Sequence, residues 1–136
     1  MFRALLSHLL LIPISGCVYC QAKIRNATDE TIRVKTIHTG EVVTISPGHS
    51  TKFAHSGGDL LVEAKAKLLM FRDVGVFVGT GQYSHHGAIF NWVCTHFLLD
   101  KDWRIYALRP GARTVDKNCP QPEGYPKTGE DWIDAK

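Results

Sequence analysis

The 136-residue sequence predicts an all-β fold, a small antiparallel β-sandwich or barrel. Two patterns support this prediction. Apolar residues in several short segments alternate with polar ones at period two, and turn residues recur about every ten positions. The composition, with 44% hydrophobic and 21% charged residues and no repeat or low-complexity tract, is typical of one folded domain.

The first expected strands lie between residues 31 and 54. Residues 31–37 alternate apolar with charged side chains, as a half-buried strand does. Gly40 interrupts this pattern and residues 42–45 resume it, so these two segments are predicted to form a hairpin. Residues 51–54 are predicted to form a further short strand.

Residues 59–71 allow two interpretations. Alternate positions from Leu60 onward are apolar, as in a strand. Leu61 and Phe71 belong to a set with helical spacing, behind an Asp59 that suits a helix N-cap. We predict a strand because the flanking segments are strand-like, and an α+β fold with one helix near 59–71 is the alternative.

Residues 88–99 are the strongest predicted strand. They are apolar on both faces, which is usual for a central strand in a sheet. Residues 100–102 form a tight turn into a second run at 103–108, so the two runs are expected to form a hairpin. The β-domain as a whole is predicted to span residues 23–109.

Residues 110–136 are predicted to form an irregular tail that docks on the β-domain. Proline restricts the backbone and lacks an amide donor, and four of the six prolines lie in this tail. Trp132 and Ile133 near its end supply apolar surface for docking. The four prolines are Pro110, Pro120, Pro122 and Pro126.

The N-terminus has the features of a secretory signal peptide over residues 1–16. Arg3 supplies a positive charge, residues 5–14 are mainly apolar, and the small residues Ser15 and Gly16 suit a signal peptidase. The apolar run is too short to span a bilayer. We therefore expect an exported chain, and its weak net charge of +3 gives no reason to expect a nucleic acid partner.

The segment Ile14-Ser15-Gly16-Cys17 resembles the lipobox of bacterial lipoproteins. The resemblance covers only the leader. It implies cleavage after Gly16, diacylglycerol on the Cys17 thiol and an acyl chain such as palmitate on the new amine, with residues 17–22 as the lipidated cysteine and a short tether. Because Val18 rather than Asp follows the cysteine, the pattern resembles lipoproteins that enteric bacteria sort to the outer membrane, facing the periplasm. The alternative is an ordinary cleaved signal.

Cysteine usage fits an oxidising compartment. If Cys17 carries lipid, Cys20, Cys94 and Cys119 remain for one disulfide and one free thiol. We predict a Cys94–Cys119 disulfide, because it would fix the proline-rich tail to the core. A Cys20–Cys119 disulfide is the main rival, and two disulfides become an alternative if Cys17 is not lipidated.

The histidines do not form a recognisable metal motif. A metal site needs three or four ligands that the fold brings together, and adjacent His85 and His86 would point in opposite directions on an extended backbone. No glycine elbow surrounds Ser84 to expose a nucleophile. We therefore predict no metal, no cofactor and no enzymatic activity.

These observations favour a membrane-anchored envelope lipoprotein that acts as a non-catalytic protein-binding or structural module in the periplasm. Its size and location also suit an immunity or exclusion factor. The candidate binding residues are aromatic and histidine side chains near loops, because aromatic residues concentrate binding energy at interfaces: Tyr83, His85, His86 and Trp103. The alternatives are a periplasmic zinc or copper binder that uses histidines, and a small hydrolase.

Overall fold

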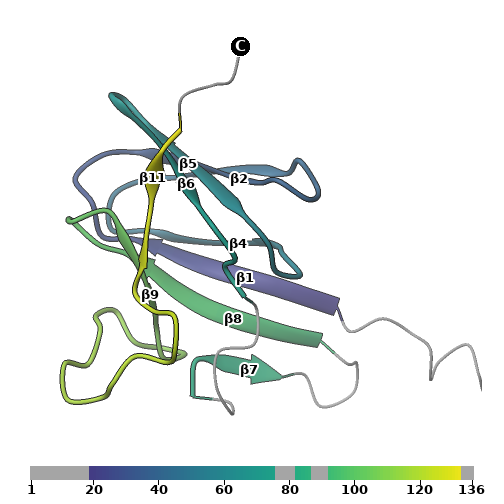
Figure 1. The fold of residues 1–136 in the computed structure, drawn as a ribbon. Helices are drawn as coiled ribbons and strands as arrows, with labels where there is room; N and C mark the ends of the chain where they lie inside the picture. Colours follow the sequence, from purple (N-terminus) through teal and green to yellow (C-terminus); the bar gives the residue numbers. More distant parts are fainter. Residues whose placement is uncertain (1–18, 76–81, 87–91, 133–136) are drawn as a thin grey trace, which may run out of the picture.

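The computed structural model describes residues 19–75, 82–86 and 92–132. These residues form two β-sheets that pack face to face, which confirms the predicted all-β sandwich (Figure 1). The expected signal peptide, residues 1–16, and Cys17 lie outside the described residues. In the part of the chain that is described, no helix has the length and apolar character needed to cross a membrane.

Sheet A has six strands, in the order β10-β9-β8-β1-β4, with β7 also paired to β8. Sheet B has five strands, in the order β11-β6-β5-β2-β3. The strands of sheet A are β1 (Tyr19–Asn26), β4 (Ser50–Ala54), β7 (Ser84–His86), β8 (Trp92–Leu99), β9 (Arg104–Ala107) and β10 (Lys127–Thr128). The strands of sheet B are β2 (Ile32–Thr36), β3 (Val42–Ile45), β5 (Leu60–Ala64), β6 (Lys67–Phe71) and β11 (Glu130–Asp131).

Strand β8 is central in sheet A, as its apolar character on both faces predicts. Strand β1 pairs with the whole length of β8 along one edge, whereas β7 and β9 pair with successive parts of the other edge of β8. The β1–β8 pairing is parallel, and the other pairings among the described strands are antiparallel. The predicted hairpins at 31–45 and 88–108 correspond to β2–β3 and β8–β9, and residues 88–91 of the second lie outside the described residues.

The hydrophobic core lies between the two sheets. Inward-facing side chains alternate with outward-facing ones along each strand, as the period-two pattern requires. Burying each large aliphatic or aromatic side chain contributes about 1.5–3 kcal/mol. The fully buried core side chains include Ile24, Ile32, Val34, Val62, Phe71, Phe97, Leu99 and Ile105.

Residues 59–71 form a hairpin rather than a helix. Strands β5 and β6 pair antiparallel from Leu60↔Phe71 to Ala64↔Lys67, and residues 65–66 form the turn. The prediction of β-structure is therefore confirmed and the helical alternative is wrong, but the segment forms two strands joined by a turn where one strand was expected. The alternating side chains of β5 reach the core, and this burial outweighs the helical spacing of the same segment.

Strand β1 begins at Tyr19, earlier than the predicted start of the β-domain at residue 23. The residues after 18 in the expected 17–22 tether are therefore already part of sheet A. The cause is the long parallel pairing with β8, which starts at Tyr19↔Trp92, and the complete burial of Ala22. A pairing between such distant segments leaves no local signal in the sequence.

The C-terminal tail connects the two sheets. It is irregular after β9, as predicted, but it then forms β10 against β9 in sheet A and β11 against β6 in sheet B. Figure 1 shows this segment running from one layer to the other along the side of the sandwich. The amide of Trp132 then donates to the Leu68 carbonyl at 2.8 Å, so the tail stays attached to sheet B beyond β11.

Candidate functional site

The outer face of sheet B, directed away from the core, is the candidate functional site. Register places its side chains in two neighbouring rows across the strands, because residues directly opposite each other share a face. The first row consists of Thr44, Arg33, Glu63 and Leu68, and the second of Val42, Lys35, Leu61 and Met70.

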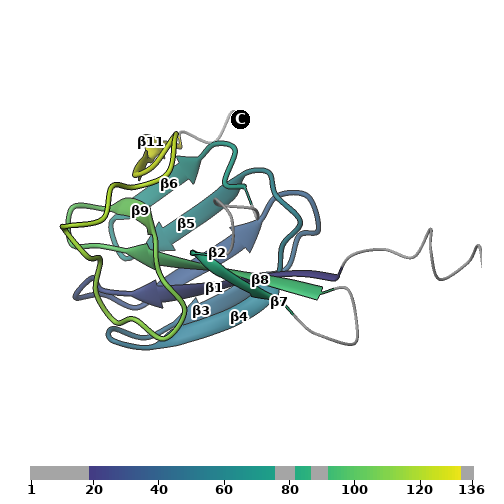
Figure 2. The ribbon, with the colours of Figure 1, turned by 90° about the horizontal axis from the view of Figure 1, so that it is seen from below.

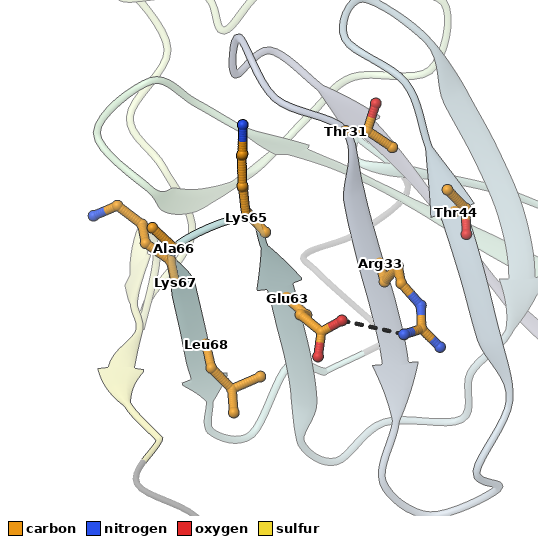
Figure 3. Close-up of a pocket in the computed structure, with 9 residues that line it drawn as sticks. Thr31, Arg33, Thr44, Glu63, Lys65, Ala66, Lys67 and Leu68 are labelled. Carbon is orange, nitrogen blue, oxygen red and sulfur yellow. Dashed lines mark hydrogen bonds and ion pairs between the residues drawn. The ribbon is translucent and has the colours of Figure 1, made fainter.

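A broad, shallow hollow of about 640 Å³ lies over the first row and the β5–β6 turn. Figure 3 shows Arg33 and Glu63 reaching toward each other across its floor, with Lys65 extending from the turn at its rim. A second hollow of about 230 Å³ adjoins it over Lys35, Val42 and Leu61. The two share Arg33 and Glu63, so they form one continuous surface.

The charges on this surface are mainly positive. Arg33 Nη1 lies 3.1 Å from Glu63 Oε1, with 58% and 51% of the two side chains exposed. Such an exposed pair contributes at most about 1 kcal/mol, so both groups remain free to reorient toward a partner. The hollows are lined by the cations Arg33, Lys35, Lys65 and Lys67 and by one carboxylate, Glu63.

Apolar side chains lie among these charges. Val42 on the edge strand β3 is 42% exposed, and Leu61 and Leu68 are half-buried. Met70 in the second row is only 3% exposed. The surface therefore mixes apolar and charged side chains: Arg33, Lys35 and Glu63 lie on the middle strands β2 and β5, with apolar side chains beside them. Protein–protein interfaces have such a mixed composition.

Arg72 forms ion pairs at the edge of this face, beside β11. Its guanidinium contacts Asp59 Oδ2 at 2.9 Å and Glu130 Oε1 at 3.1 Å, and it lies 5.3 Å from the centre of the Trp132 ring. A hydrogen bond from the Asp73 amide and a further one from Arg72 hold the pKa of Asp59 below its ordinary value. The hydrogen bonds to Asp59 and Glu130 raise the pKa of Arg72, so it remains a cation.

Two of the sequence-predicted binding residues occupy other places in the fold. Tyr83 is 4% exposed, belongs to the core and donates its hydroxyl to the Pro120 carbonyl at 3.1 Å, so it fixes the tail and has little surface to offer a partner. Trp103 is half-buried in the β8–β9 turn, with Lys67 Nζ 5.3 Å from its ring centre. Neither residue lines the outer face of sheet B.

His85 and His86 lie in β7, where they pair with Cys94 and Val93 of β8. Their side chains lie outside what the structure describes. No group of three or more metal-ligating side chains occurs among the described residues.

The predicted Cys94–Cys119 disulfide is not formed, and the described cysteines Cys20, Cys94 and Cys119 are not bonded to one another. Cys94 is fully buried in β8, where burial raises the pKa of its thiol against the opposing effect of Lys52 and Lys23. Cys119 lies in the tail, where Arg109 Nη2 donates to its sulfur at 2.6 Å. The tail is held by main-chain pairing and by Tyr83, so its attachment does not need a disulfide.

Sequence reasoning did not identify the outer face of sheet B. Alternation predicts that Arg33 and Lys35 point outward, but a half-exposed valine or leucine on a polar face has no distinct local signal. Val42, Leu61 and Leu68 come together only through the register of four strands.

Comparison of the chain with protein-family models, with curated proteins and with solved structures found no match.

Proposed function

We propose that this protein is a lipid-anchored component of the bacterial envelope that binds another protein, without catalysis, through the outer face of sheet B. The observation that carries the proposal is the wide, shallow surface over the two side-chain rows. Sites for small molecules are usually deep and mainly apolar, whereas this surface is open and mixed in character. A protein partner fits it better than a small molecule does.

The charge of the surface defines the chemistry of the partner. Four cationic side chains and one carboxylate line the hollows. Electrostatic complementarity raises the rate of association and suppresses partners of like charge. We therefore expect a partner that presents acidic residues interspersed with apolar ones. An inhibitory role, as in immunity or exclusion, is one form that such binding would take.

The leader sequence supports the anchor. The lipobox-like segment ends at Cys17, and β1 begins two residues later at Tyr19. Each buried methylene of an acyl chain contributes about 0.8 kcal/mol, so the two or three chains of a lipoprotein hold a domain at a membrane where a single chain does not. The proposal thus places the β-sandwich close to the membrane surface.

Charge reversal tests the binding face. We expect Lys35→Glu to reduce the amount of a partner that copurifies with the full chain from detergent-solubilised membranes, because an acidic side chain then opposes the acidic partner. Lys101→Glu is the matched control, since Lys101 is exposed in the β8–β9 turn and lines neither hollow. Equal copurification with both variants and with the unaltered chain would contradict the proposed face.

A further inference from the structure

The outer face of sheet A carries a second cluster of basic side chains. Lys52 of β4, Lys23 of β1 and His96 of β8 are register partners, so they form one row across three adjacent strands. Their neighbours Ala22 and Phe97 face the core, which places this row on the opposite, outer side of the sheet. Arg25 lies in the next row, opposite Ser50.

This row is electrostatically unfavourable in the protein alone. Lys23 and Lys52 lie directly opposite each other in an antiparallel pair, where like charges destabilise a sheet. Within the described part of the chain, Lys23, Lys52 and Arg25 form no ion pair. A bound anion would relieve this repulsion.

The C-terminal tail turns this surface into a cavity. Residues 111–113 cover part of the sheet and enclose about 170 Å³ with Lys23, Arg25, Ser50 and His96. Within this wall, the Ala112 amide donates to the Arg109 carbonyl at 3.0 Å. Further along the tail, the Gln121 side chain bonds both the amide and the carbonyl of Ala107 in β9, at 2.8 and 3.0 Å. Arg113 adds a further cation to the lining, and no carboxylate is among the lining residues.

An apolar hollow of about 350 Å³ adjoins the cationic cavity on the same face. Leu98 and Tyr106, which are register partners, form part of its lining together with Val115 of the tail. Arg113 lines both spaces. A ligand with an anionic head and an apolar body would fill both.

We propose that the cationic cavity binds a phosphate group, held by Lys23, Arg25 and Arg113, and that the adjoining hollow accepts an apolar part of the same ligand. Guanidinium groups donate paired hydrogen bonds to phosphate oxygens, and a phosphate carries enough charge to satisfy several cations, whereas one carboxylate does not. The site lies on the opposite sheet from the proposed protein-binding face and does not depend on it.

The phosphate group has two sources, a free phosphate or the headgroup of a phospholipid. Inorganic phosphate and hexyl phosphate distinguish these sources, with hexanol as the uncharged control.

Titration calorimetry of the full chain in a neutral detergent, at constant ionic strength, tests the site. We expect inorganic phosphate to bind the unaltered chain. Lys23→Gln and Arg25→Gln should each weaken the affinity for phosphate about tenfold, and the control Lys101→Gln should leave it unchanged. We expect hexyl phosphate to bind more tightly than inorganic phosphate, and Val115→Asn to reduce this difference. Equal affinities of the two phosphates would contradict the role of the apolar hollow and identify free phosphate as the ligand. Failure of both phosphates to bind, or equal weakening by Lys101→Gln, would overturn the proposal.

Thermal unfolding of Lys52→Gln separates a binding role from a structural one. Removing one of the opposed lysines relieves repulsion, so we expect this variant to unfold at the same or a higher temperature than the unaltered chain without phosphate. Added phosphate should raise the unfolding temperature of this variant by less than it raises that of the unaltered chain. A lower unfolding temperature without phosphate, together with an equal rise on adding phosphate, would contradict the proposed phosphate site.

Discussion

His55 is a buried histidine that the sandwich keeps neutral. Its side chain is 3% exposed, and its Nε2 lies 2.7 Å from the Val74 carbonyl oxygen, which fits an N–H donor at this position. Burial lowers the pKa of His55, against the smaller opposing effect of this hydrogen bond. The residue joins the end of β4 to the segment after β6 and so links the two sheets.

The lowered pKa of His55 predicts a loss of stability in mild acid. The unfolded chain binds a proton near pH 6.5, whereas folded His55 does so only at lower pH, so the free energy of unfolding falls as pH drops below about 6.5. This group contributes a slope of at most about 1.4 kcal/mol per pH unit. Urea unfolding between pH 7.5 and 4.5 should show a shallower fall for His55→Gln, and identical slopes would refute the assignment.

Among the structural elements, the tail segment that passes from β10 in sheet A to β11 in sheet B depends on Gly129. A Cβ at this position would lie 2.9 Å from Phe71 Cζ and 3.0 Å from Leu69 Cβ, both closer than packed atoms tolerate. Gly129 separates β10 from β11, so any shift there disturbs the pairing with both sheets.

We predict that Gly129→Ala destabilises the protein by about 1–3 kcal/mol in urea unfolding, the usual cost of adding a methyl group to a packed core. Gly75→Ala is the matched control, because an added Cβ there meets no atom within 4 Å. The control should change stability by less than about 0.5 kcal/mol. Similar effects of the two substitutions would show that the tail crossing does not constrain the fold.

Some strands of the fold can be predicted from the sequence and others cannot. Strands β2, β3 and β8 follow from alternating side chains or from an apolar run, because burial on one or both faces leaves a local pattern. Strands β10 and β11 have two residues each, too few for any period to be visible. The parallel β1–β8 pairing joins segments about seventy residues apart, and only tertiary packing selects it.

The candidate site was less predictable than the fold for the same reason. An aromatic residue near a loop suggested that Tyr83 is a binding residue, but its ring turns into the core to hold the tail. The direction of that side chain depends on the position of Pro120, far along the chain. The outer face of sheet B likewise exists only once four strands are in register.

At the scale of the whole molecule, the proposed anchor and the two proposed binding faces form one arrangement. Figure 2 shows β1 starting at the end of the sandwich opposite the loop between β9 and β10. The proposed lipid on Cys17 would hold the domain by the end where β1 starts. The outer face of sheet B would then remain available to a partner in the periplasm.

We predict that Cys17→Ser abolishes fatty-acid labelling and shifts the chain out of the detergent phase in phase separation, because the thiol is the expected attachment point of the diacylglycerol. Cys20→Ser is the matched control, three residues further along the chain. It should retain labelling and membrane partitioning. Unchanged labelling of Cys17→Ser would refute the lipoprotein assignment.

Site-specific photo-crosslinking in intact cells tests whether the outer face of sheet B binds a protein. A photoreactive amino acid at Leu61 places the probe in the middle of the outer face of sheet B, and the same amino acid at Lys101 places it in the exposed β8–β9 turn. The proposed function predicts a discrete crosslinked protein from Leu61 that is lost when Lys35→Glu is added, and none from Lys101. Absence of a crosslink at Leu61, or one that is unaffected by Lys35→Glu, would contradict a charged protein-binding face on sheet B.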